Sequence, residues 1–271
     1  MDEKHWGCAK QTAIGCAVLI ALAIILPIAL GVMMISPFNR AVEARNALEQ
    51  KFGPQEAFVP SPSGAPTPNR VEDFLEVRRT LAVTCADFRQ AEEQVRQLER
   101  FDDQDEVSRM AVLKQALSTS RSMMGMGPLI GNFYETRNQS LLDAEMGLGE
   151  YTYIYVLAYR DQILDPPEDL QLLGPGATNR RVRRALVSML EHQLQGLRDA
   201  GADESEATVI ETQIAALTED TSRIPWQEGT PQAITDALAP YREELDSLHC
   251  PATAPLELML NEKRGPAVET L

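Results

Sequence analysis

The chain has 271 residues, a formal net charge of −15 and a hydrophobic content of 44%. A chain of this length buries a sizeable core, and after an apolar N-terminal segment it leaves enough residues for one soluble domain. The acidic charge excludes nucleic acid as an expected partner, because phosphates would repel the domain.

Residues 12–35 form an apolar run without a charged side chain, after a short N-terminal tail, residues 1–11. The run exceeds the about 20 apolar residues that cross a bilayer core, so it predicts a transmembrane anchor. Lipidation of Cys16 is excluded, because the apolar region follows this cysteine instead of preceding it. A cleaved signal peptide with small residues at 29–31 is the alternative, although the apolar run continues beyond that site.

A short tail, one span and a long domain are the usual layout of a signal anchor. Basic residues flank the span on both sides without clear asymmetry, so this layout decides the expected orientation. Arginine outnumbers lysine and alanine is abundant, a bias typical of GC-rich bacterial coding sequences. We therefore expect a single-pass protein of the bacterial inner membrane, held there by residues 12–35, with a periplasmic domain.

Two segments separate the span from this domain. The first, residues 36–52, predicts a membrane-proximal helix, because four of its residues share one helical stripe: Ala41, Arg45, Leu48 and Phe52. The second, residues 53–69, is rich in proline, glycine and serine and predicts a tether or an extended strap over the domain.

Residues 70–98 show the clearest periodicity in the chain. Apolar positions recur every seven residues, and a second set follows three residues behind, which predicts a long, coiled-coil-like helix: Phe74, Leu81, Phe88 and Val95, then Val77, Thr84, Ala91 and Leu98. The acidic turn at 101–106 starts a second helix with an apolar face at Met110, Leu113, Leu117 and Met124. Gly125, Gly127 and Pro128 are expected to end it.

The stretch "GEYTYIYVLAY" (149–159) alternates tyrosines in a way that fits either a strand or a helix. A strand would lack partners, and a lone strand is unstable. As part of a helix from Leu141 to Leu164 the stretch is apolar on nearly every side, which is typical of a buried helix. We therefore expect the central helix of a bundle here, with Gly147 and Gly149 allowing another helix to approach closely.

Three further amphipathic helices are predicted at 178–199, 204–220 and 231–248, the last kinked or broken at Pro240. The expected fold is therefore all-α: an N-terminal transmembrane helix, then a helical bundle over residues 70–260 with long, partly coiled-coil-like helices. A disordered tail, residues 261–271, is expected to follow.

The soluble domain contains two cysteines, Cys85 and Cys250. Paired cysteines are common in an oxidising compartment, and two buried free thiols are the alternative. Bundle topology is able to bring them together, because Cys85 lies in the heptad helix and Cys250 follows the last helix.

Motifs for catalysis, metals and cofactors are absent from the sequence. The glycine-containing segments 125–131 and 174–181 lack nucleotide-loop spacing, and neither His192 nor His249 has the spacing of zinc ligands. No metal, no cofactor and no catalytic residue is therefore predicted.

One buried polar cluster is expected around the tyrosine-rich helix. Glu150 shares a face with apolar side chains, so its carboxylate needs donors if it is buried. The candidate members of the cluster are Glu150, Tyr151, Tyr153, Tyr155, Arg137 and Arg160.

These patterns favour a membrane-anchored, extracytoplasmic interaction or scaffold domain over an enzyme. A helical surface would bind a protein partner or a second copy of the chain. The alternative is an exported ligand-binding domain or enzyme with a polar site beside the Glu150 region. A pocket with convergent polar groups there favours the alternative, whereas an exposed apolar stripe from Phe74 to Val95 favours a partner.

Overall fold

The computed structural model describes residues 36–100, 109–164, 175–202, 204–220, 225–226 and 229–258. These residues form helices joined by loops and turns, with no β-strand among them, which confirms the all-α prediction. No helix within these ranges is long and apolar enough to cross a membrane. The predicted span and the predicted C-terminal tail lie outside the described residues.

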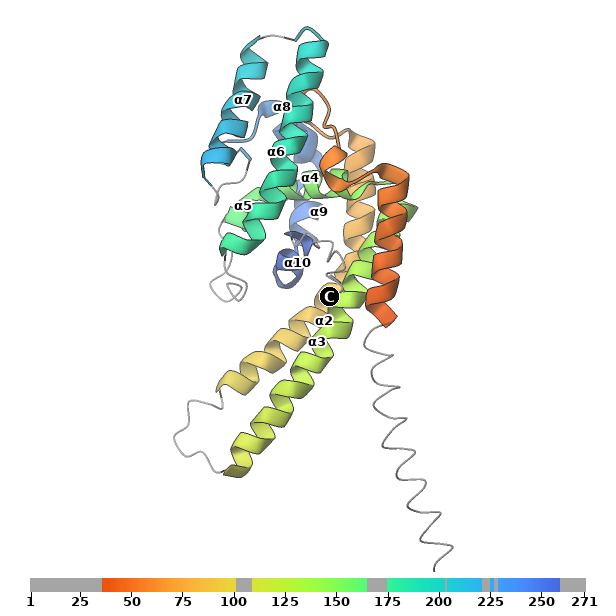
Figure 1. Ribbon diagram of the computed structural model, residues 1–271, viewed down its shortest axis with the longest axis vertical. Helices are drawn as coiled ribbons and strands as arrows, with labels where there is room; N and C mark the ends of the chain where they lie inside the picture. The colour runs from red at the N-terminus through yellow and green to blue at the C-terminus, as the bar shows by residue number, and fades with distance from the viewer. Residues whose placement is uncertain are drawn as a thin grey trace, which may run out of the picture.

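Two long neighbouring helices, α2 (Pro68–Arg100) and α3 (Arg109–Asp143), organise the bundle (Figure 1). The helix at 36–52 lies beside α3 and leads into the short η1 (Gln55–Ala57). Two helices, α4 (Leu148–Ala158) and α5 (Arg160–Leu164), cross the middle of the molecule, and α6 (Pro175–Asp199) with α7 (Glu204–Glu219) forms a second hairpin. The C-terminal elements are α8 (Gln232–Leu238), η3 (Ala239–Tyr241), α9 (Arg242–Ser247), η4 (Pro251–Thr253) and α10 (Ala254–Leu258).

The heptad stripe of α2 forms part of the core. Phe74, Val77, Leu81 and Phe88 are all buried. The sequence left open whether this stripe faces a partner, and the structure shows that this part of it packs inside the chain. The side chains of Val95 and Leu98 lie outside the described residues.

The expected helix break at Gly125 to Pro128 is wrong, because α3 runs through Pro128. Proline lacks the N–H of one intrahelical hydrogen bond, and the helix at 36–52 packs against α3 on both sides of it, at Gly127 and Gly131. The nearby Gly131 explains part of that packing: a Cβ atom at this position would lie 2.8 Å from Cβ of Pro37. The small residue lets the helix at 36–52 approach α3 closely.

A single helix from Leu141 to Leu164 is also wrong. Glu145 adopts a positive φ of 48°, Met146 N donates to Leu141 O, and Glu145 N donates to Leu142 O. This bonding pattern is a Schellman motif, which ends α3 at Asp143. Glycine is the usual residue at the positive-φ position, so the glutamate there gave no sequence signal that the helix ends.

The tyrosine-rich segment is helical, and every residue of α4 except Glu150 is buried. Short helical segments do approach both glycines: Phe52 of the helix at 36–52 lies against Gly147, and η1 with the following strap residue Phe58 lies against Gly149. A Cβ atom on Gly149 would lie 2.4 Å from Gln55 O and 2.6 Å from Cβ of Phe58. Gln55 Nε2 also donates to Thr152 Oγ1 over 2.7 Å. The strap is therefore packed tightly on α4.

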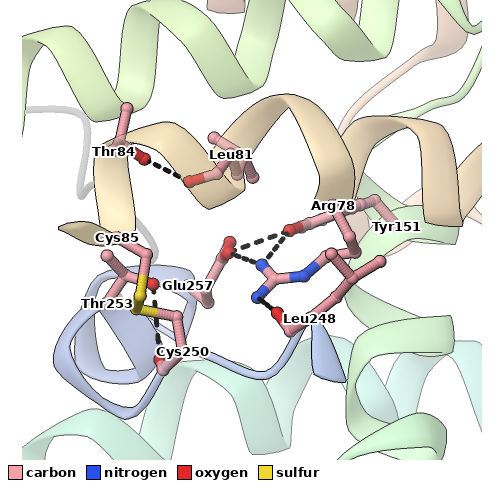
Figure 2. Close-up of a disulfide and its surroundings, with 9 residues drawn as sticks. All are labelled: Arg78, Leu81, Thr84, Cys85, Tyr151, Leu248, Cys250, Thr253 and Glu257. Carbon is pink, nitrogen blue, oxygen red and sulfur yellow. Dashed lines mark hydrogen bonds and ion pairs between the residues drawn. A yellow bond between two sulfur atoms is a disulfide. The ribbon is translucent and has the colours of Figure 1, made fainter. Parts of the chain in front are cut away.

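The predicted break at Pro240 is confirmed. Here α8 ends at Leu238, η3 contains the proline, and α9 begins at Arg242. The chain then turns through η4 into α10, which brings its last described residues beneath α2 (Figure 2).

Candidate functional site

The most deeply buried charges of the described residues meet between α2, α4 and α10. Arg78 on α2 forms an ion pair with Glu257 on α10, and the side chains are 1% and 0% exposed. Tyr151 on α4 accepts a hydrogen bond from Arg78 over 3.1 Å and donates to Glu257 over 2.9 Å. Arg78 also donates to Leu248 O over 2.9 Å, so four segments converge on one guanidinium (Figure 2).

A second guanidinium, Arg137 on α3, approaches the same carboxylate. Its Nη1 lies 3.7 Å from Glu257 Oε2, and its guanidinium stacks 4.9 Å from the ring of Tyr134. Hydrogen bonds hold the Arg137 side chain in place, because Arg137 donates to Asn138 Oδ1 and Asn138 donates to Ala41 O. The buried cluster thus contains two cationic side chains and one carboxylate.

Aromatic rings enclose Arg78. The rings of Tyr155 and Tyr159 lie 5.3 and 5.4 Å from its guanidinium carbon, distances at which a cation is attracted to a ring face. Burial raises the pKa of both phenols, so both remain neutral, and the Tyr159 hydroxyl donates to Leu245 O over 3.1 Å. Beside Tyr159 lies His249, where burial and the positive charge of Arg78 lower the imidazole pKa to about 4.

A disulfide joins Cys85 on α2 to Cys250, with a Cα–Cα distance of 6.0 Å. Both cysteines are buried. The bond closes a loop with a sequence separation of 165 residues. It fixes the start of the segment that carries Glu257 directly beside the helix that carries Arg78 (Figure 2).

Glu150 lies at the edge of the core and not inside it. Its side chain is 18% exposed and binds Arg70 through both carboxylate oxygens, at 2.7 and 2.5 Å. The correction has a local reason: α4 begins only at Leu148, so Glu150 occupies its first turn, at the rim of the bundle. There the carboxylate also faces the positive end of the helix dipole.

A small cleft of about 150 Å³ opens beside this rim pair, between the strap and α4. Arg70, Glu150 and Tyr153 line it. Their polar groups are already bonded, since Arg70 also binds Asp73 over 2.6 Å and Tyr153 donates to Gly64 O over 2.8 Å. The cleft is smaller than the roughly 300–1,000 Å³ of typical ligand pockets.

The six residues of the predicted polar cluster therefore fall into separate environments. Tyr151, Tyr155 and Arg137 surround the buried charges, whereas Tyr153 and Glu150 face the strap. Arg160 lies elsewhere: it donates to Trp226 O over 2.9 Å and to Thr230 Oγ1 over 2.5 Å.

Sequence reasoning did not assign the central roles to Arg78 and Glu257, although each carries a signal. Arg78 interrupts the apolar stripe of α2, between Leu75 and Leu81. Glu257 is the one charged residue in the run "PLELML" (255–260). A charged side chain inside an apolar pattern is rarely buried without a partner, so two such residues of opposite sign predict a pair.

The buried cluster fits a structural role better than a catalytic one. The side chains of Arg78, Tyr151 and Glu257 bond to one another, and each of these residues is at most 3% exposed to solvent. Within the described ranges, no three His, Cys, Asp or Glu side chains gather as metal ligands.

Comparisons with protein-family models, with curated proteins and with solved structures found no match. The functional argument therefore rests on the residues and on the geometry described above.

Proposed function

We propose that this chain is a membrane-anchored, extracytoplasmic interaction or scaffold protein of the bacterial inner membrane. The observation that carries the proposal is the shape of the α2–α3 hairpin. Residues 88–100 of α2 and 109–127 of α3, here termed the arm, project beyond the remaining helices (Figure 1). A projecting pair of helices presents surface that a partner can contact.

The disulfide supports the extracytoplasmic placement. Structural disulfides persist in oxidising compartments and are rare in the cytosol. Cys85 and Cys250 are bonded and buried, close to the base of the arm. Export through the predicted span at 12–35 would bring them into such a compartment.

The bonds that the charged side chains make within the chain itself support a scaffold over an enzyme. The buried charges bond to one another, and the polar residues of the rim cleft are bonded to groups of the chain itself. The cleft beside Glu150 favours ligand binding as a second candidate function, because an arginine, a carboxylate and a tyrosine do line it.

Site-specific photocrosslinking in membranes tests the proposed arm surface. A benzophenone amino acid replaces Gln90 or Glu93, exposed on α2, and the matched controls replace Val209 or Thr212, exposed on α7. We expect a discrete adduct from the α2 positions and none from α7. An adduct of twice the chain mass would identify self-association, and a larger or smaller one a different protein.

Equal adducts from α2 and α7, or none from α2, would contradict the arm as the interaction surface. Protease added to spheroplasts tests the topology separately: degradation of the domain supports export, and its protection contradicts export.

A further inference from the structure

We propose that Arg78, Arg137 and Tyr151 form a carboxylate-binding site, that the chain's own Glu257 occupies this site as an internal ligand, and that a small free carboxylate can take its place when Glu257 is removed. The inference goes beyond the proposed interaction function and does not depend on it. It rests on how the donors are held, on how the carboxylate is delivered and on which donors Glu257 leaves unused.

The donors come from three helices that do not need Glu257 to hold them. Arg78 belongs to α2, lies against the rings of Tyr155 and Tyr159, and binds Leu248 O. Arg137 belongs to α3 and is fixed by Asn138. These contacts of the two guanidiniums remain available when the carboxylate is removed.

The carboxylate is delivered by a short separate segment. The structure describes α10 over Ala254–Leu258, and a helical segment of this length depends on tertiary contacts. Besides the ion pair, the segment is held by the disulfide at Cys250, by the buried Leu256 side chain, and by the hydrogen bond from Tyr134 to Leu256 O. Glu257 thus resembles a tethered ligand whose effective concentration the disulfide keeps high.

The internal ligand does not use the full donor set. Arg78 Nε and the Tyr155 hydroxyl are buried and have no hydrogen-bond partner among the described residues. Glu257 Oε2 is likewise without a hydrogen bond, with Arg137 Nη1 at 3.7 Å. A small free carboxylate, unlike Glu257, is not attached to the backbone and can shift toward Arg78 Nε and the Tyr155 hydroxyl. We therefore expect the site to accept small monocarboxylates such as acetate or formate.

Chemical rescue of a full-length Glu257→Ala variant tests the proposal. The variant removes the carboxylate that faces Arg78, Arg137 and Tyr151, and leaves two unneutralised guanidiniums beside the empty space. Its melting temperature should rise by about 3–5 °C in roughly 100 mM sodium acetate relative to sodium chloride of equal ionic strength. The unaltered chain should respond equally to the two salts, because Glu257 already fills its site.

Two variants show where the acetate acts. In Glu257→Ala/Arg78→Met, one of the two cations is absent, and the acetate effect should disappear. In Cys85→Ser/Cys250→Ser, Glu257 is still present but less firmly tethered, so the acetate effect should be intermediate between Glu257→Ala and the unaltered chain. Hydrogen exchange of residues 250–258 should increase in this variant, while α4 stays protected.

A Glu257→Ala chain that melts identically in acetate and chloride would overturn the proposal, as would an equal acetate effect in the Arg78→Met double variant. If Glu257→Ala does not fold in chloride, its refolding from urea in acetate is measured instead. Recovery in acetate alone supports the site. Failure in both salts while Glu257→Gln folds would show that volume and not charge is missing, and would also overturn the proposal.

Discussion

Among the arginine–glutamate pairs that tie α2 to other described helices, the pairs of Arg70 and Arg78 lie in different environments. The rim pair, Arg70 with Glu150, has the better fork geometry, since two nitrogens meet two oxygens. Its side chains are 25% and 18% exposed, whereas those of Arg78 and Glu257 are 1% and 0% exposed. Water screens the first pair and cannot replace a lost partner in the second, so burial and not geometry decides how much each pair matters.

The largest expected effect comes from removing the buried carboxylate. Glu257→Leu strands two guanidiniums in the core and should lower the free energy of unfolding by about 3–5 kcal/mol. Adding Arg78→Met removes one stranded charge and should recover part of the loss. Urea unfolding measures both variants. The comparison would fail if the double variant were less stable than Glu257→Leu alone.

The second largest effect on stability is expected from the tight packing of the strap on α4, beside the rim pair. Gly149→Ala places a methyl group against Gln55 O and should cost about 1–3 kcal/mol, because the strap must move. Gly196 on α6 is the matched control, since nothing lies within 4 Å of an added Cβ atom. Gly196→Ala should stabilise the helix by up to about 1 kcal/mol. Thermal unfolding of the two variants should therefore shift in opposite directions.

A pH effect is expected from His249, which lies beside Tyr159 near the buried pair. His249 has a folded pKa of about 4, below its ordinary value of 6.5. The unfolded chain therefore binds more protons between these values, so stability should fall as pH drops from about 6.5 to 4. Partial exposure of the ring limits the loss to about 1–2 kcal/mol. His249→Gln should flatten this part of the stability profile, and an unchanged slope would contradict the assignment.

The smallest effect is expected at the rim carboxylate. Glu150→Gln and Glu150→Leu should each cost about 1 kcal/mol or less and should differ little from each other, because water reaches the donors of Arg70. Urea unfolding in low and high salt measures both. A loss from Glu150→Leu as large as that from Glu257→Leu would remove the distinction between the pairs.

The helices were predictable where their signals are local. The heptad stripe from Phe74 to Phe88, the absence of partners for a tyrosine-rich strand, and the proline in the last helix each indicated the structure that is observed. The errors arose where tertiary packing overrides local preference. Helix α3 continues through Pro128, where the helix at 36–52 packs against it. The positive-φ position that follows the end of α3 is Glu145, although glycine is the usual residue there.

The candidate site shows the same division. The sequence supplied the candidates Tyr151, Tyr155 and Arg137, and it named Cys85 and Cys250 as possible partners. It placed the buried carboxylate at Glu150. The helical period shows which residues share a face, but it does not show where the helix begins and therefore did not reveal that Glu150 lies in the first turn.

The sequence by itself indicated an all-α fold and which faces of the long helices are apolar, because both follow from the side chains of one segment and the helical period. Only the tertiary structure decided that Glu257, far along the chain from Arg78, is the carboxylate removed from water. That choice depends on which helix ends meet and on how much solvent remains between them. Neither quantity is a property of any one segment.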